Sequence, residues 1–133
     1  MSDIFKKSDE LKVIVLAKRL IKHTMKISNN SDRYPKKARF TLVDPIQKTV
    51  IEIYKLLLKA NYLNTNIRSQ FEERLLCQSE AIYNCDVLLL YIELSLDENY
   101  INDKSCEYWV RQVMDVKKMI LAWKNGDLKR SSF

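Results

Sequence analysis

Residues that form tight turns are scarce in this chain, and this scarcity constrains the fold more than any other feature. Among 133 residues there are one glycine and two prolines, while 47% of the residues are hydrophobic. An all-β fold needs frequent tight turns, and most of these take Gly or Pro. We therefore predict an all-α protein. A chain of this length is expected to form one domain with a single core.

Four segments show the apolar spacing of amphipathic helices, with steps of three and four residues. They cover about residues 8–28, 35 or 45–63, 66–97 and 103–125. The expected core positions are Ile14, Ala17, Ile21 and Met25; Ile46, Val50, Ile53, Leu57 and Ala60; Phe71, Leu75, Gln78, Ile82, Cys85, Leu89, Ile92 and Leu96; and Cys106, Trp109, Val113, Val116, Ile120 and Trp123. Four such segments are typical of an antiparallel, up-down four-helix bundle.

Local signals mark the ends of these helices. Ser8 and Asn102 are candidate N-caps of the first and fourth helices. Gly126 stands where a residue in the left-handed conformation would end the fourth helix.

The start of the second helix has two interpretations. Asp44 can cap a helix whose first residue is Pro45. Alternatively, Pro35 opens the helix ten residues earlier, and Pro45 then produces a kink.

The net charge of +6 is concentrated at the N-terminal end of the chain. Residues 1–42 carry eleven Lys or Arg and four Asp or Glu, whereas residues 43–100 carry five and nine. On the first helix the cations form one arc opposite the apolar stripe, and the basic run continues beyond the helix. The predicted binding residues are Lys18, Arg19, Lys22, Lys26, Lys36, Lys37 and Arg39. Such a patch favours polyanionic partners, although a merely solvated face is the alternative.

Two aromatic residues lie within the basic run. Tyr34 and Phe40 could stack on nucleic-acid bases, or they could be core residues. Because Phe40 lies beside the apolar Leu42, we expect its ring to be buried. On that expectation, Phe40→Ala would destabilise the fold by about 3–5 kcal/mol.

The sequence predicts neither an active site nor a metal or cofactor site. His23 is the single histidine and has no partner at motif spacing, so a surface role is expected. Cys77, Cys85 and Cys106 have no CxxC spacing and predict neither a disulfide framework nor a zinc site. Cys85 occupies a core position instead. One glycine cannot form a phosphate-binding loop, and we expect no catalysis.

Cellular context and assembly follow from the apolar residues. No apolar run approaches the roughly 18–20 residues of a membrane span, and the N-terminus does not resemble a signal peptide, so we expect a cytoplasmic protein without a membrane partner. Apolar residues nevertheless occupy more than one face of two helices, at Val15, Leu16 and 87–92. This surplus predicts a self-associating protein.

Charged residues on the third and fourth helices have simple interpretations. Glu72 and Glu73 beside Arg74 are expected on a solvated face with intrahelical pairs. Lys117 falls within an apolar arc, where its stem could pack while its ammonium reaches water, or it could face a partner.

The run Tyr34-Pro35-Lys36-Lys37-Ala38-Arg39-Phe40-Thr41-Leu42 resembles the Pro-Lys/Arg-x-x-Arg-Phe-x-Leu signature of the accessory variability determinant (Avd) proteins. In those proteins the signature lies at the first helix–helix junction. The resemblance covers roughly residues 10–126 and includes Leu58-Lys59-Ala60-Asn61, Tyr108-Trp109 and Met119–Trp123. The chain departs from the family at Val43, where a Gly is usual, and at Pro45, where a basic residue is usual.

The resemblance implies a four-helix bundle that assembles into a homopentameric barrel. It also implies a non-catalytic accessory protein of a diversity-generating retroelement, whose partners are a reverse transcriptase and its template RNA or cDNA. The second hypothesis is a stand-alone structural or interaction protein of the type encoded in intervening sequences of large-subunit ribosomal RNA genes. Such a protein would have no nucleic-acid role.

Overall fold

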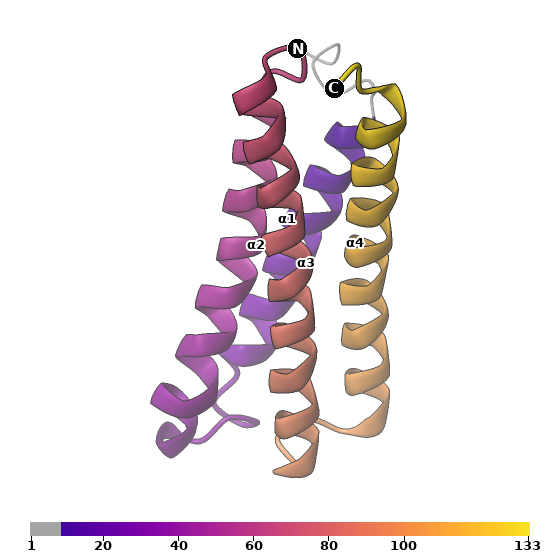
Figure 1. The fold of residues 1–133 in the computed structure, drawn as a ribbon. Coiled ribbons are helices and arrows are strands. Elements are labelled where there is room, and N and C mark those ends of the chain that lie inside the picture. Colours follow the sequence, from indigo (N-terminus) through magenta and orange to yellow (C-terminus); the bar gives the residue numbers. More distant parts are fainter. Residues whose placement is uncertain (1–8) are drawn as a thin grey trace, which may run out of the picture.

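The protein is an all-α bundle of four helices, described by a computed structural model from Asp9 to Phe133, with side chains from Lys12 onward. The expected cap at Ser8 lies outside these residues. The helices are α1 (Asp9–Ser28), α2 (Asp44–Tyr62), α3 (Arg68–Asp97) and α4 (Asp103–Arg130). Figure 1 shows that α1 and α3 run in one direction and that α2 and α4 run in the other. Each helix packs against its neighbours along the chain, and α1 also packs against α4. The predicted up-down arrangement is therefore confirmed.

The core follows the predicted apolar stripes closely on α2 and α4. Ile46, Val50, Ile53, Leu57 and Ala60 are buried on α2, and α4 buries Trp109, Val113, Val116, Ile120 and Trp123. Trp109 is the largest of the fully buried side chains, and its indole N–H donates to Thr24 Oγ1 on α1 at 3.0 Å. The buried indole thus has the hydrogen-bond partner that its polar N–H requires.

The buried stripe of α3 differs from the predicted one at every second position. Phe71, Gln78, Cys85 and Ile92 are buried as expected. The intervening core positions are Arg74, Ala81, Leu88 and Ser95, each one residue before the predicted Leu75, Ile82, Leu89 and Leu96. The predicted set is wholly apolar, whereas the buried set contains the polar Arg74 and Ser95, so apolar spacing indicated the wrong direction for the stripe. Three of these four buried residues are small or polar, the exception being Leu88, and the four predicted aliphatic residues are half-buried.

An ion pair occupies the core where α3 meets α4. Arg74 donates to Asp127 through Nε at 2.7 Å and through Nη2 at 3.0 Å, and neither side chain is more than 6% exposed. Gln78 Nε2 also donates to Asp127 at 2.8 Å, and the Arg74 guanidinium lies 4.8 Å from the centre of the Trp123 ring. A buried charge requires such pairing. Arg74 therefore does not lie on a solvated face. Glu72 forms an intrahelical pair with Arg68, as expected, whereas Glu73 pairs with Lys59 on α2.

The fourth helix extends beyond its predicted end. It continues to Arg130, so Gly126 lies inside the helix and does not adopt a positive φ. Asp127 explains the extension, because its buried carboxylate ties the last turns of α4 to α3. The start of α4 agrees with the prediction, since Asn102 Oδ1 accepts a hydrogen bond from the Ser105 N–H at 2.8 Å.

The second helix begins with two irregular turns. A 3₁₀ turn (Lys36–Ala38) and a π turn (Arg39–Val43) lead directly into α2. Asp44 is not a cap, because its N–H donates to the Arg39 carbonyl within the π turn. Pro45 follows in the first turn of α2, where its missing N–H leaves few helical bonds unmade. Both predicted starts therefore describe part of one helical run.

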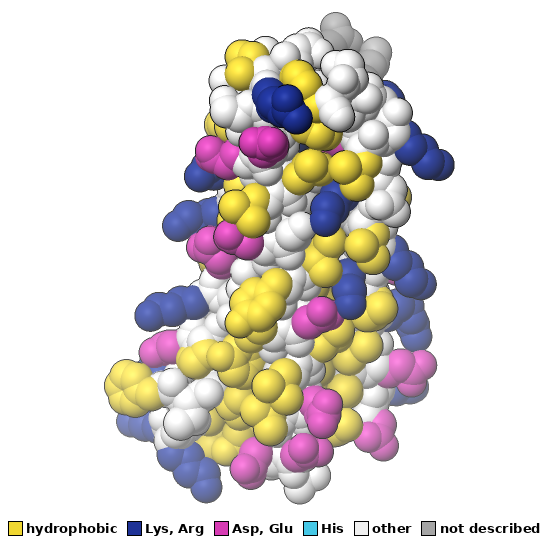
Figure 2. Space-filling view, viewed as in Figure 1, with side chains coloured by type: hydrophobic (Ala, Val, Ile, Leu, Met, Phe, Trp, Pro, Cys, Tyr) yellow, Lys and Arg dark blue, Asp and Glu magenta, His cyan; other side chains and the backbone are white. Residues whose placement is uncertain are grey.

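Apolar side chains also cover part of the outer surface of α3. Leu76, Tyr83 and Leu90 are exposed at intervals of seven residues, so they form one line along the helix. Figure 2 shows hydrophobic side chains spread over this face, with acidic side chains between them. The helix Arg68–Asp97 is long and apolar enough to cross a membrane. The core helix of a helical bundle can have the same length and composition, so this is weak evidence for a membrane span. The apolar residues of α1 differ, because Val15 and Leu16 are half-buried in the bundle.

Lys117 joins α4 to α3. Its ammonium donates to Asp86 at 2.7 Å, and 24% of its side chain is exposed. The stem therefore packs against the bundle while the charge reaches the surface, which is the first of the two interpretations given above.

Candidate nucleic-acid interface

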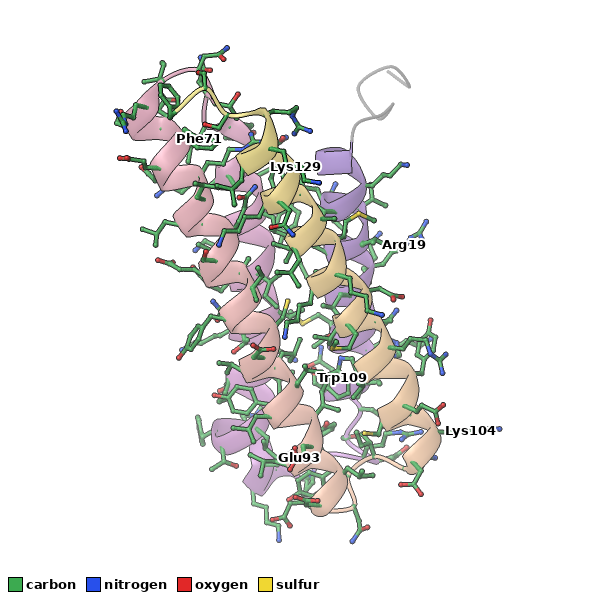
Figure 3. The ribbon with its side chains drawn as sticks, turned by 45° about the vertical axis from the view of Figure 1, so that its right-hand side comes forward. Arg19, Phe71, Glu93, Lys104, Trp109 and Lys129 are labelled. Carbon is green, nitrogen blue, oxygen red and sulfur yellow. The ribbon has the colours of Figure 1, made fainter. Side chains whose placement is uncertain are left out.

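The outer face of α1 is cationic along most of its length. Lys18, Arg19, Lys22 and Lys26 are all exposed, while Val13, Ala17 and Leu20 on the opposite face are buried. Figure 3 shows Arg19 pointing away from the bundle and Trp109 lying between the helices. The helix therefore presents the predicted cations to solvent.

His23 lies at the edge of this face and adds little to its charge. Its ring packs edge-on against Tyr108, with 4.9 Å between the ring centres. Burial and the nearby Lys26 lower the pKa of His23 below its ordinary value, so the imidazole is mainly neutral at pH 7. The expected surface position is thus only half correct, because the ring is a packing element between α1 and α4.

The segment between α1 and α2 carries the remaining predicted cations on an anchored backbone. Tyr34 and Ala38 are buried, and the Tyr34 ring lies 5.3 Å from that of Tyr100. Arg33 reaches Ser105 at the start of α4, with 3.4 Å between Nη1 and Oγ. These contacts hold the segment against the α3–α4 connection. Its outward side chains include Lys36, Lys37 and Arg39, all of which are exposed.

The seven predicted cations share one electrostatic property: they have no carboxylate partner. In the described part of the chain, no Asp or Glu forms an ion pair with any of them. Several ion pairs of the described residues lie on α2, α3 and α4, as between Lys59 and Glu73 at 3.4 Å. Within the described residues, no ion pair therefore neutralises these seven cations.

The position of Phe40 corrects the prediction from the sequence. Its side chain is 81% exposed, whereas Leu42 is 6% exposed and Val43 is 7% exposed. The 3₁₀ turn places Ala38 in the core, and the wide π turn then buries Leu42 and Val43, which leaves residues 39–41 outside. The expected burial of the Phe40 ring is therefore wrong, and its apolar neighbour Leu42 enters the core instead. Tyr34, being buried, is not available to stack on a base.

A hollow of about 370 Å³ lies beside this turn. Its wall is formed by Ser28, Asn29, Ser31, Tyr34, Pro35, Lys36, Arg39 and Val43. Gln47 Nε2 donates to Ser28 Oγ at 2.9 Å and to Asn29 Oδ1 at 2.8 Å, which ties α2 to the end of α1. The wall has two cations and no carboxylate. Three other hollows of the molecule have Asp127, Asp115 or Glu52 in their walls.

A groove between α1 and α4 brings the predicted Arg19 together with residues to which the sequence assigned no binding role. Leu16 and Arg19 face Tyr108, Arg111 and Asp115 across a hollow of about 220 Å³. Tyr108 is 50% exposed, and Arg111 pairs with Glu107 at 3.2 Å. No pattern within either helix could reveal this groove, because it depends on how α1 and α4 are aligned.

The described residues contain no arrangement that suggests covalent or metal chemistry. No group of three or more His, Cys, Asp or Glu lies close enough to hold a metal ion within them. Cys85 is fully buried, and desolvation raises the pKa of its thiol to about 12. A thiol of that pKa is an inert core group at neutral pH, in agreement with its predicted core position.

The local geometry therefore defines a candidate surface, consisting of the outer face of α1 and the segment from Lys36 to Phe40. Comparisons with protein-family models, with curated proteins and with solved structures found no match.

Proposed function

We propose that this protein is a non-catalytic accessory protein of a diversity-generating retroelement. In this proposal its basic surface binds a reverse transcriptase together with template RNA or cDNA. The observation that carries the proposal is the set of seven exposed cations that form no ion pair with a carboxylate in the described part of the chain. The resemblance of Tyr34–Leu42 to the Avd signature suggests the class of partner, and the polymerase would supply the chemistry.

The spacing of the cations supports a polyanionic partner. Lys18, Lys22 and Lys26 follow one another at intervals of four residues, which places like charges side by side on the helix. Such pairs destabilise a helix, and an acidic residue at any of these positions would relieve the repulsion. A phosphate backbone would relieve it from outside by neutralising the cations and releasing its own counterions.

We also propose that copies of the chain associate through the outer face of α3. Leu76, Tyr83 and Leu90 offer an exposed apolar line with acidic side chains around it (Figure 2). The cations belong to a different helix, α1, which lies behind α3 in Figure 1. When one face of a copy contacts a different face of the next copy, the copies form a ring if the rotation between neighbours adds up to a full circle. The resemblance implies five copies. Light scattering of a micromolar solution tests this, since a mass of 15.8 kDa would exclude any ring.

The second candidate function is a structural or interaction protein of the ribosomal intervening-sequence type. The apolar line on α3 favours it, because that surface fits a protein partner and needs no nucleic acid. The two candidates differ in one property, the salt-dependent binding of nucleic acid.

The decisive experiment replaces Lys36, Lys37 and Arg39 together with Gln and measures binding to RNA and DNA at several salt concentrations. Each phosphate contact contributes about −0.7 for single strands and about −0.9 for duplex DNA to the log–log slope, so the slope should flatten by about two to three units. The matched control replaces Lys104, Lys118 and Lys129 on α4, which are also exposed and outside any ion pair of the described chain.

The control variant should retain the wild-type slope and capture the reverse transcriptase as the wild type does. The first variant should lose that capture if polymerase and nucleic acid share the surface. The nucleic-acid role would be rejected if the wild type showed no salt-dependent binding and the first variant still captured the reverse transcriptase fully. Those results would favour the second candidate.

A further inference from the structure

Phe40 has an exposure that folding does not explain. Burial of a phenylalanine ring stabilises a protein, yet this ring is 81% exposed. Leu42 and Val43, two and three residues further along the chain, are both buried in the core. It also lies in a π turn, a rare conformation that is frequent at functional sites. A solvent-exposed aromatic ring held on an ordered turn is suited to contact a ligand.

The surroundings of the ring restrict the chemistry of that ligand. Arg39 directly precedes Phe40, so their Cα atoms are 3.8 Å apart. Arg39 and Lys36 lie in the wall of the 370 Å³ hollow, whose other polar residues are Ser28, Asn29, Ser31 and Tyr34. The wall thus offers an anion two cations and no carboxylate. The site therefore combines an anion-binding hollow with an exposed aromatic face.

We propose that this turn is a binding site for single-stranded nucleic acid. Lys36 and Arg39 hold a backbone phosphate at the hollow, and the ring of Phe40 stacks on an adjacent base. The inference rests on the proposed nucleic-acid role and adds a preference for unpaired strands to it. Stacking requires a base that is free of its duplex neighbours, whereas phosphate contacts alone do not distinguish single strands from duplexes.

The test compares a labelled twelve-nucleotide oligouridine with a duplex of the same length by fluorescence anisotropy. Phe40→Ala should weaken binding of the single strand by about five- to 150-fold, which corresponds to the loss of one stacked base. Binding of the duplex should change less than about twofold, since it uses the cations alone. Lys36→Gln with Arg39→Gln should weaken both ligands and flatten each salt slope by about one to two units.

Tyr62 provides a matched control. It is 79% exposed and is the last residue of α2. It therefore lies at the opposite end of α2 from the π turn that carries Phe40. Tyr62→Ala should leave both affinities unchanged. Phe40→Trp should retain affinity for the single strand, and its emission should be quenched by oligouridine but not by the duplex.

Different results separate the two proposals. The single-strand site would be overturned if Phe40→Ala bound oligouridine as tightly as the wild type does. It would also be overturned if Phe40→Ala lost affinity equally for oligouridine and for the duplex. Either result would leave the nucleic-acid role intact. Absence of any binding by the wild type would overturn both. A change in oligomeric mass on Phe40→Ala, without a change in affinity, would assign the ring to contacts between copies and would also overturn the site.

Discussion

Removal of the Asp127 carboxylate should be among the most damaging single changes to this fold. Arg74 is buried and donates two hydrogen bonds to the Asp127 carboxylate, at 2.7 and 3.0 Å. In Asp127→Ala the guanidinium stays in the core beside the Ala60 and Leu63 carbonyls, at 3.3 and 3.4 Å, and these acceptors do not neutralise its charge. Breaking a buried pair by removing one partner typically costs about 3–5 kcal/mol.

This free energy converts to a large change in melting temperature. An unfolding entropy of about 2.1 cal/mol/K per residue gives about 0.28 kcal/mol/K for the whole chain. Asp127→Ala should therefore lower Tm by about 11–18 °C. Circular dichroism at 222 nm measures the change, with equal protein concentrations for all variants because self-association would make Tm depend on concentration.

A double variant distinguishes the lost pairing from lost packing. Arg74→Met with Asp127→Leu removes both charges and keeps the volume, so its Tm should lie closer to the wild-type value than that of Asp127→Ala. A shift below about 4 °C for Asp127→Ala would refute this account of the network. So would a double variant that is as unstable as the single one.

Three further changes test other parts of the structure. Phe40→Ala should alter Tm by less than about 2 °C, whereas Leu42→Ala should destabilise by about 2–5 kcal/mol; comparable losses in thermal melts would contradict the exposure of the ring. Leu90→Glu should lower the mass seen by light scattering without lowering helix content, and an unchanged mass would remove α3 from the interface. At pH 8 iodoacetamide should modify Cys106 well before Cys85, because burial raises the pKa of Cys85 to about 12 and leaves a thiolate fraction of about 10⁻⁴. Mass spectrometry after short labelling times gives the order, and early labelling of Cys85 would show that α3 opens.

Periodicity alone predicted the fold and most of the core, because α2 and α4 each carry one apolar stripe. It failed on α3, where Leu75 and Leu89 offered a second stripe beside the true one. Arg74 could not be recognised as a core residue, since its partner Asp127 lies 53 positions away and the pairing depends on the alignment of α3 with α4.

The candidate surface was predictable only in part. The α1 cations follow from a helical wheel, because an exposed face needs no knowledge of neighbouring helices. The position of Phe40 does not follow, since the wheel assumes 3.6 residues per turn and the chain forms a 3₁₀ turn and then a π turn at this point. The hollow beside Arg39 likewise depends on Gln47 bonding to the end of α1.

The anchoring of the segment between α1 and α2 has a consequence for binding. Tyr34 and Ala38 hold its backbone in the core, and Arg33 contacts Ser105 on α4. Lys36 and Arg39 therefore project from a scaffold that is already ordered before a ligand arrives. A disordered basic arm would lose backbone entropy on binding, whereas this segment is preorganised and loses mainly side-chain freedom. Association should then show a small heat-capacity change and no gain of helix, which distinguishes docking onto a formed surface from folding coupled to binding.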